Sequence, residues 1–290
     1  MKSIGIIGYG SLGASLAHAL CEKGMLSWLL IRNEHVRKKA ENVHVPIFSS
    51  LDEIPVKDCS IILAIPDSEI QGVAKIIHEM YEGKGCHALI HCSGSLGIDI
   101  LSGNDSSIAC IGIHPFQTIV SHADLPDTPW GIECREEDIQ DAKALINSLR
   151  GVPHVLSPKA IENKALYHAT AVASANLLQM LIALTSTMAD AADIPSALFL
   201  PKIQSTTLDR AHASLHEHMS VLHHLTGPLI RCDIQTIRAN REAIRQIPGM
   251  DEVYTALCKA IIPQLLESKQ ISEKDVTTLQ HVLNLDEPAR

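Results

Sequence analysis

The chain has 290 residues, of which 46% are hydrophobic and 20% are charged, and its formal net charge is -9. This length fits two domains better than one compact core, and the apolar share excludes a chain that is mostly disordered. The acidic balance argues against a nucleic acid or an anionic membrane surface as the main partner, because phosphate groups are bound by clustered Lys and Arg side chains.

The eight cysteines are scattered along the sequence and form no C-x-x-C pair. We expect them to be buried thiols of a protein in the reducing cytoplasm. The N-terminal stretch lacks the basic, apolar and cleavage-site pattern of a secretory signal. The low-charge run over 165–192 is long enough to span a membrane, but His168, Asn176 and Gln179 interrupt it. We therefore expect a buried helix of a soluble protein there.

The first half alternates short apolar runs with helical patterns, which is typical of a parallel sheet wrapped by helices. Strands are predicted at 3–7, 26–31, 60–65, 88–91, 108–113, 131–134 and 154–156. Helices are predicted at 11–23, 34–41, 68–80 and 136–149. The strands lack polar alternation, as expected when helices cover both faces of the sheet.

From residue 157 onward the apolar positions recur only at helical spacing. Ser157 and Pro158 resemble an N-cap followed by proline at the first helical position. Helices are predicted at 157–190, 200–225, 234–246, 250–268 and 273–283. We therefore predict an α/β domain with a doubly wound sheet over 1–156 and an all-helical domain for substrate binding and dimerisation over 157–290.

Three glycines follow the first predicted strand in the pattern G-x-G-x-x-G, at Gly8, Gly10 and Gly13. In the dinucleotide-binding Rossmann motif the first glycine allows a sharp turn, the second lets a pyrophosphate approach, and the third lets helix and strand pack closely. The start of the helix offers unpaired N–H groups to the anion. The predicted contacts are Gly8, Tyr9, Gly10, Ser11, Leu12 and Gly13. The alternative is a tight turn without a ligand.

The end of the second predicted strand bears on the choice between NADH and NADPH. An acidic residue there binds the ribose 2'-hydroxyl of NADH, but this sequence has Arg32 and Asn33 at that position. A guanidinium can bind a phosphate with two hydrogen bonds, so the sequence favours NADPH. In the alternative interpretation, Arg32 is a solvated surface residue and Glu34 binds the ribose.

Ligands in parallel α/β folds lie beyond the carboxyl ends of the strands. Ile65 and Pro66 end one strand and are predicted to contact the cofactor, although Pro66 could simply begin a helix. Ser93 and His114 follow two later strands and are candidates for orienting a substrate carboxylate or carbonyl. Ser93 could instead form a turn, and the imidazole of His114 could be satisfied by backbone groups.

The long helix predicted at 157–190 carries His168 and Asn176, which are eight residues apart and therefore on a similar face. Polar groups in an apolar stretch need partners, and a substrate is one way to supply them. His168 is the predicted proton donor to a carbonyl or imine, because the imidazole pKa is nearest the working pH. Lys164 is a rival donor. Alternatively, His168 and Asn176 only cross-link helices in the core.

A second group of histidines, His212, His216 and His223, falls near one face of a predicted helix. The four-residue spacing of the first two is compatible with metal binding. No carboxylate or cysteine pattern supports such a site, so we predict a polar helix face and no metal.

Four motifs together carry a family resemblance: HCSG at 91–94, HPFQT at 114–118, YHATAVASAN at 167–176 and LTGPLIRCD at 225–233. With the glycine motif, the whole chain resembles the superfamily of β-hydroxyacid dehydrogenases, ketopantoate reductases and pyrroline-carboxylate reductases. In that superfamily a Rossmann domain precedes a helical, dimer-forming domain, which implies a homodimer here. The chain is most similar to a bacterial branch often labelled deazaflavin-dependent NADP reductases, some of which serve as ketopantoate reductases.

The resemblance also implies roles for particular residues. Ketopantoate reductases carry a catalytic lysine and two asparagines at four-residue intervals on one helix. His168 aligns with the lysine, Val172 with the first asparagine and Asn176 with the second, so the mechanism does not transfer unchanged. In the last motif Arg231 would face the cleft and bind a substrate carboxylate, while Asp233 would cap the next helix.

The leading hypothesis is an NADPH-dependent reductase acting on a small 2-keto acid, with ketopantoate as the first substrate to assay. His168 would be the general acid, Asn176 and His114 would orient the carbonyl, and Ser93 or Arg231 would hold the carboxylate. One alternative is a reductase of a cyclic imine, pyrroline-5-carboxylate. Another is a protein that senses NADPH without turnover, which the missing lysine and first asparagine suggest.

Overall fold

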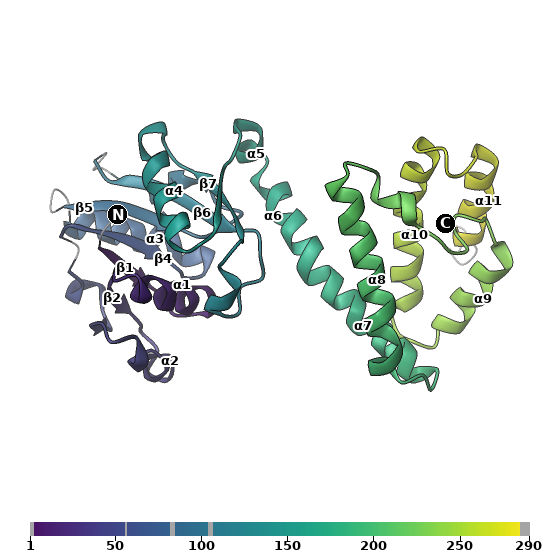
Figure 1. Cartoon of the computed structure of the whole chain (residues 1–290), viewed down its shortest axis with the longest axis horizontal. Coiled ribbons are helices and arrows are strands. Elements are labelled where there is room, and N and C mark those ends of the chain that lie inside the picture. Colours follow the sequence, from purple (N-terminus) through teal and green to yellow (C-terminus); the bar gives the residue numbers. More distant parts are fainter. Residues whose placement is uncertain (1–2, 56, 82–84, 104–106, 285–290) are drawn as a thin grey trace. The chain divides into compact units, whose positions relative to one another are not determined.

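The computed structural model describes residues 3–55, 57–81, 85–103 and 107–284. It contains an eight-stranded sheet in the order β3-β2-β1-β4-β5-β6-β7-β8 (Figure 1). The strands are β1 (Ile4–Ile7), β2 (Leu26–Leu30), β3 (Ile47–Phe48), β4 (Cys59–Leu63), β5 (Cys86–His91), β6 (Ala109–Pro115), β7 (Pro129–Glu133) and β8 (Val152–Val155). The strand order reverses beside β1, which confirms the predicted doubly wound, Rossmann-like sheet.

Helices cover both faces of this sheet, which is why the strands are apolar throughout. The helices are α1 (Ser11–Glu22), α2 (Glu34–Lys39), α3 (Asp67–Tyr81) and α4 (Ile139–Ser148). Side chains of α1 and α4 pack on one face, with Ile6 and Ile90 of the strands. Side chains of α3 pack on the other face, with Ile61 and Leu89. Each fully buried aliphatic side chain of this kind stabilises the fold by about 1.5–3 kcal/mol.

Two features of the sheet differ from the sequence-based prediction. Strand β3 was not predicted, because two residues are too few to give a periodic signal; it pairs with β2 through Ile47 and Phe48. The pair formed by β6 and β7 is antiparallel, whereas the other described neighbours are parallel. Strand direction depends on how the chain returns to the sheet, and apolar runs do not record it.

The helix predicted at 157–190 is interrupted twice. Helix α5 (Pro158–Glu162) begins at Ser157, whose side chain accepts a hydrogen bond from the backbone of Ala160, as the N-cap prediction requires. Helix α6 (Lys164–Val172) then continues through a π-helical segment, Ala173–Leu177, into α7 (Leu178–Ala191). Short π segments within α-helices are frequent at functional sites.

The remaining helices are α8 (Ser196–His216), α9 (Ile234–Ile244), α10 (Met250–Glu267) and α11 (Glu273–Asn284). Helices α9, α10 and α11 share a core that includes Ile237, Leu265 and Leu279. Arg241 of α9 joins the same three helices, since it binds both carboxylate oxygens of Asp251 at 2.8 and 2.9 Å and the backbone oxygen of Val282 at 2.8 Å.

Contacts divide the chain into two compact units, Met1–Leu177 and Leu178–Arg290. The change from mixed to purely helical structure comes earlier, since β8 ends at Val155 and α5 starts at Pro158. The predicted boundary between 156 and 157 follows this change in secondary structure. Helices α5 and α6 belong with the sheet because Lys164 and Tyr167 of α6 bind residues of the strands.

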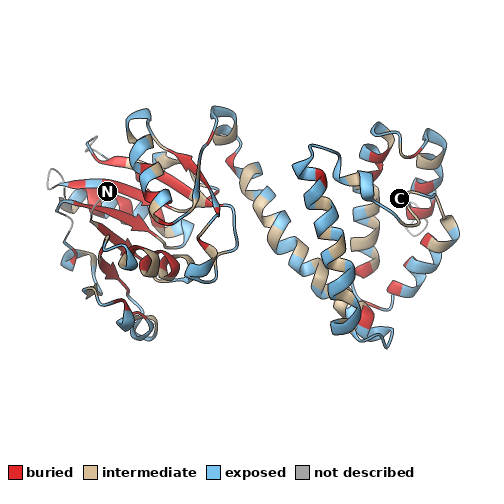
Figure 2. Ribbon diagram, viewed as in Figure 1, coloured by how far each residue is buried: buried red, intermediate tan, exposed pale blue. Residues whose placement is uncertain are grey.

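The long apolar helix is exposed in the chain (Figure 2). Lys164–Ala191 has a mean hydropathy of 1.4 and is long enough to cross a membrane, yet none of its most apolar window is buried. The expectation of a buried helix is therefore wrong for a single chain, because the described elements that pack on it, such as α8, leave its most apolar window unburied. Its first turns bind strand residues of the sheet unit, which argues against a membrane span.

Candidate active site

The turn between β1 and α1 has the geometry that the glycine motif predicts. Gly8 has a φ of +100°, and a Cβ on it would lie 2.2 Å from the backbone oxygen of Ala64. A Cβ on Gly13 would lie 2.4 Å from the backbone oxygen of Gly8. Gly10 is the N-cap of α1 without a side-chain hydrogen bond, and nothing lies within 4 Å of where its Cβ would be. The first N–H groups of the helix therefore have no side-chain partner at the cap, and an anion can approach them.

A cavity of about 460 Å³ lies at this turn and at the carboxyl ends of β4 and β5. It is lined by predicted cofactor residues: Gly8, Tyr9, Gly10, Ser11, Leu12, Gly13, Ile65 and Pro66. The other lining residues are Leu63, Ala64, Asp67, Cys92 and Ser93. The cavity sits beside the reversal of strand order, where doubly wound folds bind their ligands.

Arg32 and Asn33 follow β2 and are not among the residues that line this cavity. Arg32 forms an ion pair with Glu69 of α3, and its side chain is 67% exposed, so its guanidinium can still turn toward a ligand. Asn33 caps α2, since its side-chain oxygen accepts hydrogen bonds from the backbone N–H groups of His35 at 2.9 Å and Val36 at 3.3 Å. The sequence around Arg32 could not predict this ion pair, because Glu69 belongs to a different element.

Ser93 is fully occupied by hydrogen bonds within the protein. Its hydroxyl donates to Asp67 at 2.7 Å and accepts from the backbone N–H groups of Ser95 and Leu96, both at 3.2 Å. A hydroxyl has one donor and two acceptor positions, so none is left for a substrate. A substrate carboxylate would also meet the carboxylate of Asp67 here. This geometry supports the alternative interpretation of Ser93 as a turn former.

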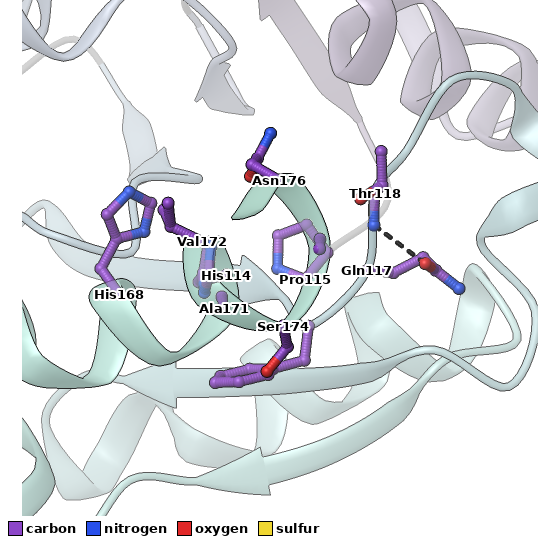
Figure 3. A pocket seen from close by; sticks show the side chains of 11 residues that line it. His114, Pro115, Gln117, Thr118, His168, Ala171, Val172, Ser174 and Asn176 are labelled. Carbon is purple, nitrogen blue, oxygen red and sulfur yellow. Dashed lines mark hydrogen bonds between the residues drawn. The ribbon is translucent and has the colours of Figure 1, made fainter. Parts of the chain in front are cut away.

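A second cavity, of about 380 Å³, lies between the end of β6 and the helix formed by α6 and the π segment. Its lining residues are His114, Pro115, Phe116, Gln117, Thr118, His168, Ala171, Val172, Ser174, Ala175 and Asn176. Figure 3 shows the helix residues His168, Val172 and Asn176 beside the strand residues His114 and Pro115. Three of the predicted catalytic residues therefore border one cavity, His114 from a strand and His168 and Asn176 from a helix distant in the sequence.

Gly94 makes room for two imidazole rings at this cavity. A Cβ on Gly94 would lie 2.7 Å from Nε2 of His114 and 2.8 Å from Nδ1 of His168. The His114 and His168 ring centroids are 5.7 Å apart. Nδ1 of His168 is buried and has no hydrogen-bond partner among the residues that the structure describes. A buried polar atom of this kind needs a partner, which a ligand can supply.

His91 and His114 are both neutral at neutral pH. Burial, followed by the charges of the nearby His168 and Lys164, lowers the pKa of His114 to about 4. Burial, followed by the charge of Lys164, also lowers the pKa of His91 to about 4. Nδ1 of His91 accepts a hydrogen bond from the backbone N–H of Ser93 at 3.2 Å, so this ring supports the turn after β5.

Lys164 is held by a buried ion pair. Its Nζ lies 2.5 Å from Oε2 of Glu133 on β7 and also donates a hydrogen bond to the backbone oxygen of Leu96. The side chains of Lys164 and Glu133 are each 9% exposed, and removing either charge alone would cost about 3–5 kcal/mol. Lys164 is absent from the lining of both cavities. It therefore fastens α6 to the sheet.

Arg231 and Asp233 belong to the second compact unit. Asp233 caps α9, as predicted, by accepting hydrogen bonds from the backbone N–H of Thr236 at 3.1 Å and from its hydroxyl at 2.7 Å. The side chain of Arg231 is exposed, and its part in the site stays a prediction. Over the described part of the chain, no three His, Cys, Asp or Glu residues gather as a metal site would require.

Two family models match successive parts of the sequence. Residues 1–115 match the model of a Rossmann-like domain, and residues 128–261 match a domain of unknown function, DUF2520. The two matches follow one another along the chain. The DUF2520 match starts next to β7 and extends into α10, so it includes His168, Asn176 and Arg231. No curated protein sequence matches the chain.

Solved structures share the fold over nearly the whole chain. BF3122 of Bacteroides fragilis, which is assigned as an NADP oxidoreductase, is 25% identical with a TM-score of 0.71, covering 90% of this chain and 97% of that chain. A pyrroline-5-carboxylate reductase from Coxiella burnetii is 15% identical with a TM-score of 0.57, covering 97% and 96%. A reductive aminase from Aspergillus terreus, in complex with NADPH and ethyl-5-oxohexanoate, is 10% identical with a TM-score of 0.61, covering 91% and 94%.

Proposed function

We propose that the protein is an NADPH-dependent reductase that delivers hydride to the carbonyl carbon of a small 2-keto acid. The observation that carries the proposal is that a lining residue of the first cavity is followed directly by a residue that contacts two imidazoles lining the second. Ser93 lines the cavity beside the glycine turn, and Gly94 lies against the two imidazoles of the second cavity. A nicotinamide ring and a substrate carbonyl can therefore approach each other across this turn.

The first cavity fits a dinucleotide. The bare positions of Gly8 and Gly10 let a pyrophosphate approach the start of α1, whose N–H groups and dipole favour an anion. The exposed guanidinium of Arg32 is proposed to bind the 2'-phosphate, after release from Glu69. The assignment of BF3122 and the NADPH complex of the reductive aminase support this nucleotide. When bound, NADPH supplies the hydride and becomes NADP+.

The second cavity supplies the groups that act on the carbonyl. As the carbonyl carbon gains hydride, the carbonyl oxygen gains a proton, and the product is a 2-hydroxy acid. Nδ1 of His168, which has no partner among the described residues, is proposed to deliver that proton. His114 and Asn176 would donate hydrogen bonds to the carbonyl oxygen and strengthen them as its negative charge develops.

The geometry favours His168 over the other candidate proton donors. His114 has its pKa lowered to about 4, so it carries no second proton to give at neutral pH. Lys164 is bound to Glu133 and to the backbone of Leu96, and it lines neither cavity. Because Ser93 is saturated with hydrogen bonds, it cannot also hold the substrate carboxylate.

The test is to measure NADPH oxidation by the purified protein with ketopantoate, with related 2-keto acids and with pyrroline-5-carboxylate. We expect oxidation with a 2-keto acid and formation of one 2-hydroxy acid for each NADPH consumed. Oxidation with the cyclic imine alone would contradict the proposed substrate class but would still support a reductase. If NADPH raises the Tm but no substrate causes oxidation, the protein is a sensor instead.

A cyclic imine is the second candidate substrate, because the neighbours by structure include a pyrroline-5-carboxylate reductase and a reductive aminase. Reduction of an imine needs the same hydride donor and a proton for the nitrogen. The two candidate substrates differ in the atom that contacts His168 and His114, which is an oxygen in the 2-keto acid and a nitrogen in the imine. Both place the chemistry beside Gly94.

We also propose that the protein is a cytoplasmic homodimer whose copies meet through the helical unit. Apolar side chains of α7 and α8 are exposed in the chain, with exposed fractions of 59% for Met180, 72% for Leu198 and 63% for Ile203. Exposed apolar surface of this extent marks an interaction site. A second copy is the proposed cover because homo-oligomers are the commonest assemblies of soluble proteins.

A further inference from the structure

Tyr167 of α6 occupies a fixed position between two strands. Its hydroxyl lies 3.0 Å from Nδ1 of His114, and its ring packs against Phe116 with the centroids 4.6 Å apart. On β7, Gly131 leaves the space that the hydroxyl fills, since a Cβ there would lie 2.4 Å from the tyrosine oxygen. Any side chain at Gly131 would push the hydroxyl away from His114.

The distance between Tyr167 and His114 allows either group to donate, and the chemistry of the two groups favours one direction. Burial raises the pKa of Tyr167, so its hydroxyl keeps its proton. The ring of His114 is neutral and has one N–H group and one acceptor nitrogen. A phenol is a better hydrogen-bond donor than acceptor, so the hydroxyl donates to Nδ1. The ring proton of His114 then resides on Nε2.

Nε2 of His114 lies on the side of the ring that meets Gly94 and His168. It lies 2.7 Å from where a Cβ on Gly94 would be, next to Nδ1 of His168 at 2.8 Å from the same point. A proton on Nε2 makes His114 a hydrogen-bond donor to a substrate oxygen without adding a positive charge. A proton on Nδ1 would instead turn a lone pair toward that oxygen and repel it.

We propose that Tyr167 is a positioning residue that fixes His114 in the tautomer with the proton on Nε2, so that His114 donates a hydrogen bond to the substrate carbonyl. The assignment of the tautomer rests on the contact between Tyr167 and His114 and on the donor strength of a phenol, whereas its use in catalysis rests on the proposed reductase function. Besides Tyr167, the titratable groups that face His114 are His168 and Lys164 of α6, Asp67 of α3 and His91 of β5.

The first experiment reads the tautomer without any need for turnover. Nitrogen NMR of the imidazole rings is recorded for the intact protein, and the His114 signals are assigned by their loss in His114→Asn. We expect the neutral ring to carry its proton on Nε2, and Tyr167→Phe to give a mixture of tautomers. The hydroxyl donates to the lone pair that a second proton would occupy, so its loss should raise the pKa of His114 in the same titration.

The second experiment measures kcat with the best substrate. Tyr167→Phe should lower kcat about tenfold, the size of one hydrogen bond, and leave the KM for NADPH unchanged. Gly131→Ala should act in the same direction because its methyl group displaces the hydroxyl. Tyr254→Phe in the helical unit and Gly72→Ala in α3, where nothing lies within 4 Å of the added Cβ, are the matched controls.

A His114 ring protonated on Nδ1 in the unaltered protein would overturn the proposal. Unchanged tautomer and kcat in Tyr167→Phe would overturn it as well. If the unaltered protein reduces no substrate, the proposed function fails, while the NMR result still decides what Tyr167 does to His114.

Discussion

The two compact units differ in how completely they bury their apolar side chains. In the sheet unit, strand residues such as Ile6, Ile62 and Ile90 are 0% exposed. In the helical unit, Leu198 is 72% exposed and Ile203 is 63% exposed, although α9 to α11 share a buried core. Figure 2 shows the same contrast between the strands and helices α7 and α8.

This difference indicates that the two units do different work. The sheet unit has a complete core, and both candidate cavities are lined only by its residues. The helical unit has more apolar surface than its own elements cover, as expected for a part that associates with another copy. If this interpretation is right, chemistry and assembly can be impaired separately, and the following variants test that.

The largest expected effect is on chemistry. Replacing His168 with Ala should lower kcat about a hundredfold or more, the usual contribution of a general acid, while NADPH binding and assembly stay unchanged. The measurement is steady-state turnover, with NADPH affinity and molecular mass determined on the same sample. If the kcat of the variant is within a few fold of that of the unaltered protein, His168 is not the proton donor, and water or Lys164 supplies the proton.

The next effect is on assembly. Replacing Leu198 with Lys places a charge on the proposed contact of α8 and should weaken self-association about thirtyfold, or roughly 2 kcal/mol. Sedimentation velocity over a range of concentrations measures this. The control is Val120→Lys in the sheet unit, because Val120 is also 72% exposed. Equal loss of association in both variants would place the contact elsewhere.

The same Leu198→Lys variant sharpens the comparison further. If the units act separately, its kcat should remain close to that of the unaltered protein at concentrations where it is a monomer. A monomer without turnover would mean that the cavity lined by sheet-unit residues does not suffice for the reaction. The separation between chemistry and assembly would then be wrong.

The smallest expected effect concerns the choice of nucleotide. Arg32→Ala should weaken NADPH binding about tenfold and leave NADH binding nearly unchanged, because only NADPH has the phosphate that the guanidinium binds. Glu69→Gln should strengthen NADPH binding a few fold, since it frees Arg32 from its ion pair at little energetic cost.

The matched control for the nucleotide variants is Glu79→Gln. It removes the same charge from the same helix, where Glu79 pairs with Lys75 instead of Arg32. Calorimetric titration with both nucleotides measures all three variants. If Arg32→Ala weakens the binding of NADPH and NADH equally, Arg32 does not bind the 2'-phosphate.

Local sequence signals predicted most elements of the sheet unit. Long apolar runs and the glycine motif define strands, helices and the turn, because each depends on neighbours within a few residues. Strand β3 and the antiparallel direction of β7 were not predicted, since β3 is two residues long and the direction of β7 depends on the path of the chain. The interruption of the long helix at Asn163 was also not predicted, because no proline or glycine marks that position.

The sites divide in the same way. The glycine turn could be predicted because Gly8 and Gly13 meet backbone groups that the motif itself positions. Glu69 and Glu133 could not be predicted as partners of Arg32 and Lys164, since each pair joins residues 31 or more positions apart on different elements. Tyr167 was included in the motif at 167–176, but the sequence predicted no role for it.

The sequence by itself determined a doubly wound sheet with a dinucleotide turn, followed by helices, because these follow from the period of apolar residues and from glycines that tolerate close backbone contact. The tertiary structure decided which polar groups remain available. It saturated Ser93 with hydrogen bonds, tied Lys164 to Glu133 and left Nδ1 of His168 without a partner among the described residues. Such availability depends on partners brought from distant strands and helices, which no local pattern records.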